Sequence, residues 1–142
     1  MAIHNPAEDV VAFLNGQTVN GRLLDDATNL FSCEPRVGTQ FPAKAVFVWE
    51  TPGAPPMPYM GTPSLRGSVW YPRVQIRIRG EPDAMSECRI TARAVRDALH
   101  RATISGYVSV LVNESSPIHL GQGAHGGPEF ALNIDLVNGG VS

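Results

Sequence analysis

Three short groups of residues in this 142-residue sequence have types and spacings that could carry out chemistry. The first, Gly121 to Gly126 (GQGAHG), matches the G-x-G-x-x-G pattern of dinucleotide-binding sites. That chemistry needs a helix directly after the turn, because the helix N-terminus binds the pyrophosphate. Here the residues after the turn predict a strand. We therefore reject nucleotide binding and interpret the glycines as allowing left-handed turns.

The other two groups are a histidine pair and an aspartate pair. His119 and His125 share one loop and could ligate a metal, but no second cysteine or acidic residue stands nearby at ligand spacing. Asp25 and Asp26 could form an acid/base pair, although adjacent aspartates in a polar loop more commonly cap a helix or contact water. We predict no metal at the first and no catalysis at the second.

The familiar catalytic motifs G-x-S-x-G, H-E-x-x-H and G-x-x-x-x-G-K-S/T do not occur in the sequence. A triad built from scattered serine, histidine and aspartate residues would leave no such motif, so the sequence alone does not exclude one. The balance of these observations predicts a protein that is not an enzyme and that needs no cofactor.

The composition is that of one globular domain, residues 1–142, with 43% hydrophobic and 17% charged residues. The formal net charge of -2 predicts no general attraction to nucleic acid or to an anionic membrane. Ten of the eleven basic residues are arginine, which favours ordered ion pairs and interfaces. Residues 66–101 carry a net charge of +4 and the remainder -6, a division that suits either head-to-tail self-assembly or solvated faces on a monomer.

The two cysteines, Cys33 and Cys88, lack the spacing of a metal site or a redox motif, so we expect free, buried thiols. Residues Met1 to Asn5 lack a basic region followed by an apolar one, and no run approaches the roughly 18 apolar residues of a membrane helix. These features predict folding in a reducing cytoplasm and no association with a membrane.

The sharpest feature is the segment Arg73 to Arg79 (RVQIRIR), in which apolar and polar residues alternate. The alternation predicts a strand with one apolar face and one arginine-rich face. The second face needs a contact partner, which is either solvent or a neighbouring copy of the same protein. Lys44 to Thr51 is apolar on both alternating faces, which predicts a strand covered on both sides.

Two helices are predicted. Asn5, Pro6 and Glu8 combine the signals of a helix start, and Gly16 ends that helix. A longer helix begins at Asp83 and carries an apolar stripe for the core. A second stripe of Arg89, Arg93, Arg96 and His100 borders the packed face, where a helix can contact another subunit or extend its arginines into solvent.

Further strands are predicted over residues 30–34, 107–113 and 129–137, with loops over 17–29 and 115–128. Residues 52–68 predict a long hairpin connection with five prolines, which is either functional or disordered. We therefore expect an α+β fold. Its mainly antiparallel sheet would have four to five strands, with the long helix packed on one face and a short N-terminal helix.

In order and composition the chain resembles the tail terminator family of long-tailed bacteriophages, which includes minor capsid and tail completion proteins. The segments that carry the resemblance follow an N-terminal helix and cover almost the whole chain. They are Asn29–Ser32 (NLFS), Ala45–Val48 (AVFV) before Pro52-Gly53, Pro72–Gly80 (PRVQIRIRG), Pro117–Gly121 (PIHLG) and Phe130–Asn133 (FALN). The sequence departs from the family pattern in the proline density of residues 52–68 and in the glycine-rich residues 121–127.

The resemblance implies a structural virion protein without cofactor that forms a hexameric ring. The ring would cap the tail tube, stop its polymerisation and join it to the head connector at the tail-neck junction, with DNA only passing through the lumen. Assembly would take place in the host bacterial cytoplasm. Alternative functions are head closure in the neck of the same head-tail joint, or a nucleic-acid-binding module that uses the arginines.

Two groups of residues are candidates for contacts in such a ring. Contacts between subunits would involve Arg73, Gln75, Arg77, Arg79, Arg89, Arg93 and Arg96. Docking to the tail tube, the connector or a neighbouring subunit would involve Met57, Tyr59, Met60 and Leu65.

Overall fold

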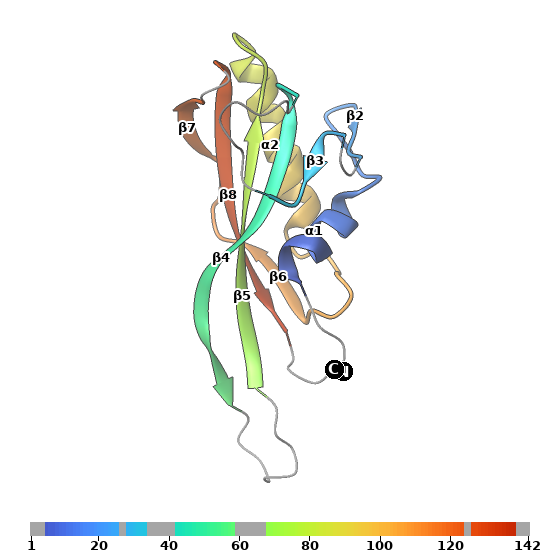
Figure 1. Cartoon of the computed structure of the whole chain (residues 1–142), viewed down its shortest axis with the longest axis vertical. Helices are drawn as coiled ribbons and strands as arrows, with labels where there is room; N and C mark the ends of the chain where they lie inside the picture. The colour runs from blue at the N-terminus through green and yellow to red at the C-terminus, as the bar shows by residue number, and fades with distance from the viewer. Residues whose placement is uncertain (1–4, 26–27, 34–41, 59–67, 124–125, 139–142) are drawn as a thin grey trace.

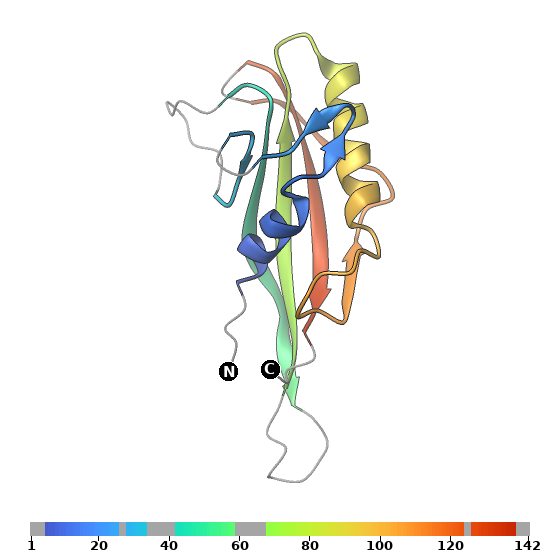
Figure 2. The same cartoon turned by 90° about the vertical axis from the view of Figure 1, so that its right-hand side faces the viewer.

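The computed structural model describes residues 5–25, 28–33, 42–58, 68–123 and 126–138. In chain order its elements are α1 (Pro6–Leu14), β1 (Thr18–Val19), β2 (Arg22–Leu23), β3 (Leu30–Phe31), β4 (Ala45–Pro58), β5 (Ser68–Arg79), α2 (Met85–Leu99), β6 (Ser109–Val112), β7 (Ile118–Gln122) and β8 (Pro128–Val137). The long strands form one layer, and both helices lie on the same side of it (Figures 1 and 2). The predicted α+β class is confirmed.

Within the described residues, six strands form the main sheet in the order β3-β4-β5-β8-β6, with β7 also paired to β8. The pair β3–β4 is parallel and the other pairs are antiparallel, so the sheet is mixed and larger than the sequence predicted. Strand β5 occupies one edge of β8. The other edge is shared end to end by β7, which pairs with residues 128–131, and β6, which pairs with residues 134–137.

The predicted loop over residues 17–29 also contains a short hairpin, β1–β2, which the sequence did not predict. Thr18 pairs with Leu23 and Val19 with Arg22, which leaves Asn20 and Gly21 as a two-residue turn. Both turn residues have positive φ, at 50° and 76°. Asn-Gly is the favoured dipeptide for this type of turn, because its twist matches that of the strands.

The predicted start of the first helix is confirmed, and that of the second is wrong by two residues. The side chain of Asn5 accepts a hydrogen bond from the backbone N–H of Glu8, and Pro6 is the first residue of α1. Asp83 has a φ of 63°, which a right-handed helix does not allow, so α2 begins at Met85.

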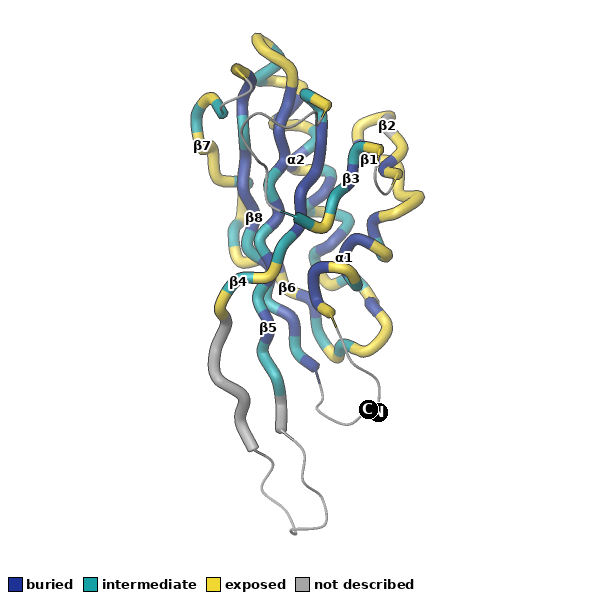
Figure 3. The backbone as a smooth tube through the Cα atoms, in the orientation of Figure 1, coloured by how far each residue is buried: buried dark blue, intermediate teal, exposed yellow. Residues whose placement is uncertain are grey.

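The helices share one face of the sheet, α1 over β4 and β5 and α2 mainly over β8. The predicted long helix on one face is therefore partly matched, because α2 covers only one side of that face. The buried residues of α2 are Cys88, Ala92, Val95 and Leu99. They pack against Val74, Ile76 and Ile78 of β5 and Leu132, Ile134 and Leu136 of β8, in a core that Figure 3 shows along the middle of the sheet.

Beyond the bridge between Trp70 and Asn138, strands β4 and β5 continue past the rest of the sheet as a two-stranded arm, residues 55–58 and 68–69 (Figure 1). The predicted loop over 52–68 is therefore wrong at both ends, and residues 59–67 lie outside the described residues. The pairing shifts register between Thr51 and Ala54 and again between Ala54 and Met57. Such irregularities bend and twist a β-ribbon. Prolines at 52, 55, 56 and 58 remove backbone donors from β4, which protects its outer edge against further pairing.

Candidate interaction surface

The face of the sheet opposite the helices carries the predicted arginines of β5. We call this surface the open face. Its residues alternate with the core residues and lie opposite each other in rows across the strands. The rows are Thr51–Arg73–Asp135–Leu111, Trp49–Gln75–Asn133, Phe47–Arg77–Ala131–Ile118 and Ala45–Arg79–Glu129.

The first row contains an ion pair within the chain, between Arg73 and Asp135. Arg73 Nε donates to Asp135 Oδ1 at 2.8 Å, and both side chains are about 40% exposed. The hydrogen bond and charge of Asp135 raise the pKa of Arg73. A pair with this exposure contributes about 0–1 kcal/mol to stability. Its main effect is to hold the guanidinium in one place on the surface.

The second row extends into a polar network at the edge of the sheet. Gln75 Nε2 donates to Asn133 Oδ1 at 3.2 Å, and Asn133 Nδ2 donates to Glu114 Oε1 at 2.7 Å. The backbone N–H of Asn133 donates to the other carboxylate oxygen of Glu114. Glu114 therefore accepts the hydrogen bonds that Asn133 of β8 donates in the gap between β6 and β7.

The third and fourth rows place guanidinium groups on aromatic rings. Arg77 lies 5.2 Å from the centroid of Trp49, and Arg79 lies 5.1 Å from that of Phe47. Phe47 also stacks with Phe31 at 5.4 Å. Phe47 is fully buried although no described helix covers this face. The prediction that Lys44 to Thr51 is covered on both sides is correct for its centre, where long side chains provide part of the second cover.

Arg79 and Arg77 differ in how their polar atoms are used. Arg79 is 7% exposed and donates from Nε and Nη2 to the carbonyl of Pro42, at 3.2 and 2.8 Å. Burial lowers the pKa of Arg79, and the charge of Glu129 opposes that effect. Arg77 is half-buried, and its Nε has no hydrogen-bond acceptor among the described residues. That Nε atom is itself buried, so within the described residues Arg77, unlike Arg79, holds a donor without an acceptor inside the subunit.

The arginines of α2 lie on the other side of the sheet, so the two predicted sets do not form one surface. Arg89 and Arg93 are exposed, and Arg89 lies 6.0 Å from the ring of Phe130. Arg96 donates from Nε to the carbonyl of Glu114 at 2.9 Å and pairs with Asp97. Of the predicted docking residues, Met57 lies in the arm opposite Val69, whereas Tyr59, Met60 and Leu65 lie outside the described residues.

The features weighed for chemistry have structural roles where they are described. The run from Gly121 leads from β7 into strand β8, which confirms that no helix follows the glycines. His119 packs its ring 5.1 Å from that of Phe130, and Asp25 accepts hydrogen bonds from Thr28. His125 and Asp26 lie outside the described residues. Among the described residues no three His, Cys, Asp or Glu side chains group as metal ligands, and no helix could cross a membrane.

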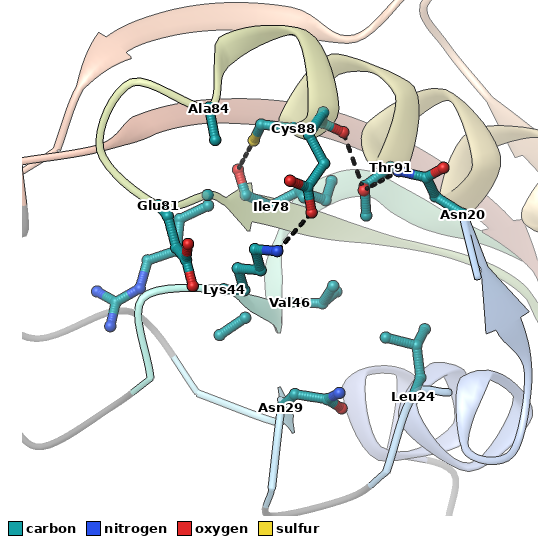
Figure 4. A pocket seen from close by; sticks show the side chains of 14 residues that line it. Asn20, Leu24, Asn29, Lys44, Val46, Ile78, Glu81, Ala84, Cys88 and Thr91 are labelled. Carbon is teal, nitrogen blue, oxygen red and sulfur yellow. Dashed lines mark hydrogen bonds and ion pairs between the residues drawn. The ribbon is translucent and has the colours of Figure 1, made fainter. Parts of the chain in front are cut away.

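A small pocket between β4, β5 and α2 is shown in Figure 4. Lys44, Ile78, Cys88 and Thr91 line it, and Lys44 Nζ binds Glu87 Oε1 at 2.5 Å. Its volume of about 30 Å³ is enough for one or two water molecules but not for a metabolite. Cys88 is buried, and burial, followed by the charges of Glu87 and Glu129, raises the pKa of its thiol to about 11. That thiol is suited to packing and not to nucleophilic chemistry.

Comparison with known protein families found no family model that matches the chain, and comparison with curated proteins found no significant match.

Strand β7 was not predicted from the sequence, because it lies inside the segment predicted as a glycine-rich loop. A signal was present, because Ile118 and Leu120 alternate with His119 directly before a glycine-rich turn and strand β8. That pattern is typical of a hairpin. The side chains of Ile118 and Leu120 are both more than 40% exposed. They belong to an apolar edge that the sequence did not predict.

Proposed function

We propose that this chain is a structural subunit of the head-tail joint of a long-tailed bacteriophage. Six copies would form a ring that caps the tail tube, stops its polymerisation and joins it to the head connector. The observation that carries this proposal is the open face, where guanidinium groups are held on aromatic rings. Fixed cations of this kind favour protein contacts, because little side-chain freedom is lost on binding.

A ring of identical subunits needs two different surfaces on each copy that fit each other. The open face supplies one of them. The arm supplies a second element that projects from the body and can reach a neighbouring subunit or the tube (Figure 1). Proline protection of β4 favours docking of the arm by its side chains and not by indefinite strand pairing.

The resemblance of the chain to tail terminator proteins supports the same proposal. Its sharpest element is the run Pro72 to Gly80, whose polar side chains lie on the open face of β5. The structure changes one part of the sequence-based hypothesis, which gave both arginine sets to contacts between subunits. Because the sheet separates the two sets, we place the ring contact on the open face.

The nucleic-acid-binding alternative is less well supported by the geometry. Arg73 binds Asp135 and Arg79 binds the carbonyl of Pro42, so two of the three arginines on β5 already have acceptors within the chain. Phosphate contacts would require those acceptors to be displaced. Retention on heparin that falls steeply with salt would favour this alternative over the ring.

Imaging of assembled particles tests the proposal directly. We expect a collar at the junction of tail and head, in which the open face of each subunit is buried against another protein. A junction without such a collar, or a collar in which Arg77 and Trp49 face solvent, would reject it.

Deletion of residues 59–67, with the strands of the arm joined by a short turn, provides a second test. We expect normal folding by circular dichroism but loss of tube capping, seen as tails of irregular length. Normal tails assembled from the shortened protein would contradict the role of the arm.

A further inference from the structure

The second unexplained surface is the edge of the sheet formed by β6 and β7. Of the six large hydrophobic side chains that are exposed in the described part of the chain, four lie along this edge. They are Val108, Leu111, Ile118 and Leu120, exposed by 75%, 43%, 41% and 43%. Concentration of exposed apolar side chains along one edge is typical of an interaction site.

The backbone of this edge is open at β7 and covered at β6. At β6 the carbonyl of Val110 accepts from the N–H of Arg101 at 2.9 Å, and the N–H of Val112 donates to His100 Nδ1 at 3.4 Å. For β7 the described residues provide pairing on one side only, from β8. Its sequence contains neither proline nor lysine, the residues that commonly protect an edge. The pairing of β7 with β8 shifts register once, between His119 and Gly121. Within the described part of the chain, the outer side of β7 therefore has backbone groups that no other strand pairs with.

The two sides of β7 differ in chemistry. On the helix side, His119 lies 5.1 Å from the ring of Phe130, and Arg89 lies 6.0 Å from the same ring. Arg93 follows Arg89 by one helical turn and is also exposed. On the open-face side, the exposed side chain of Ile118 lies opposite Ala131. One side of the edge is thus basic and the other is apolar.

We propose that β7 pairs with an extended segment of a partner protein in which acidic and apolar residues alternate. Successive side chains of an added strand point to opposite faces. The acidic ones would lie against Arg89, Arg93 and His119, and the apolar ones against Ile118. Backbone hydrogen bonds would provide affinity, and the side chains would select the sequence.

A partner protein fits this edge better than a second copy of the chain. In the described residues, the strand with alternating acidic and apolar side chains is β8, with Glu129 and Asp135. It is paired on both of its edges and cannot be donated. The proposal assigns Arg89 and Arg93 to the partner segment, and it does not depend on the formation of a ring.

A labelled peptide tests this inference with the intact chain. The probe is a fluorescent ten-residue peptide in which glutamate and valine alternate, and binding is measured by fluorescence anisotropy. We expect saturable binding that weakens as salt is raised, and no binding of the matched peptide in which lysine replaces glutamate. Failure of the glutamate peptide to bind, or equal binding of both peptides, would overturn the proposal.

Two double variants locate the site. Ile118→Ser with Leu120→Ser should weaken binding of the glutamate peptide by about tenfold or more, because it removes apolar contact at the edge without changing the charge. Arg89→Glu with Arg93→Glu should weaken it by about tenfold and favour the lysine peptide, because the charge on the helix side of the edge is reversed.

The matched control is Leu23→Ser, since Leu23 is 58% exposed but lies in the separate hairpin β1–β2. It should bind the peptide like the unchanged protein, and circular dichroism should show that all variants fold. Unchanged binding in either double variant would overturn the proposal. A wild-type dimer that Ile118→Ser with Leu120→Ser converts to monomer would also overturn it, because a second copy would then be the occupant of the edge.

Discussion

Arg77 and Trp49 lie diagonally across the pair β4–β5, with the guanidinium carbon 5.2 Å from the ring centroid. Directly opposite Arg77 in the register is Phe47, whose ring is covered by Arg79 at 5.1 Å. Each arginine therefore covers the ring of the next pair toward the arm. Diagonal neighbours on a twisted sheet are within reach of long side chains, so this order follows from the register and from side-chain length. It fixes two cations and two rings as one unit on the open face.

A double-mutant cycle between Arg77 and Trp49 should reveal this contact in the isolated subunit. We expect Arg77→Ala and Trp49→Ala to be coupled by about 0.5–1 kcal/mol in the free energy of unfolding, as is typical of a partly exposed cation–π pair. Urea unfolding of the four proteins measures the coupling. The matched cycle of Arg93→Ala with Trp49→Ala should be additive within about 0.5 kcal/mol, because α2 lies on the other side of the sheet. Equal coupling in both cycles would contradict the contact.

Charge reversal distinguishes the open face from the α2 stripe in ring formation. Arg77→Glu should lower the mass of the assembled oligomer or its occupancy on purified tails, because it places a carboxylate where the ring needs a cation. Arg93→Glu is the matched control and should leave the ring intact. Light scattering of the free protein and imaging of the tails measure both effects. A ring that tolerates Arg77→Glu, or that is lost with Arg93→Glu, would show that the contact lies elsewhere.

The contact between Gly80 and Cys88 predicts a large effect on stability. A Cβ atom at Gly80 would lie 2.8 Å from Cys88 Cβ and 3.1 Å from its Sγ, where α2 packs against the end of β5. Gly80→Ala should therefore destabilise the fold by about 1–3 kcal/mol, as overpacking of a core does.

Cys88→Gly should reduce that penalty, so that the double variant is more stable than the sum of the single changes predicts. Thermal or urea unfolding gives the comparison. Additive effects on the free energy of unfolding would mean that a methyl group at position 80 does not clash with Cys88.

The parts of the fold that the sequence predicted are those with long periodic patterns. Alternation over Arg73 to Arg79 correctly predicted β5 with one buried and one polar face, and the helical stripe of Cys88 to Leu99 correctly predicted α2. Local chemistry also predicted the start of α1 at Asn5 and Pro6. In each case neighbouring residues alone carry the signal.

The missed parts depend on contacts between distant residues or on very short strands. The parallel pair of Leu30 with Val46 joins two-residue β3 to β4, and nothing near either residue specifies it. The sequence predicts a loop for the arm because prolines are rare in paired strands, although they are accepted at an edge. On the open face the sequence predicted which residues are polar. It could not predict that Arg79 would bind the carbonyl of Pro42, or that α2 and its arginines would lie behind the sheet.

The hydrogen bond from Tyr107 to Asp9 predicts a pH dependence of stability. Tyr107 Oη donates to Asp9 Oδ2 at 2.7 Å, which joins the loop before β6 to α1. Burial, followed by this hydrogen bond, raises the pKa of Tyr107 above its ordinary value of 10. A raised pKa means that the folded state keeps the neutral phenol while the unfolded chain ionises. The stabilisation is therefore fully present below pH 10 and declines as pH rises above it.

Tyr107→Phe should thus lower the free energy of unfolding by about 1 kcal/mol at pH 7, the usual contribution of one hydrogen bond. The advantage of the unchanged protein should then shrink by up to about 1.4 kcal/mol per pH unit above pH 10. Urea unfolding of both proteins between pH 7 and 11 measures the difference. Cys88, whose pKa is raised to about 11, also contributes less to the free energy of unfolding as the pH rises above 9. This loss is the same in both proteins, so it cancels from the difference between them. A difference that stays constant through pH 11 would show that Tyr107 ionises equally in the folded and unfolded states.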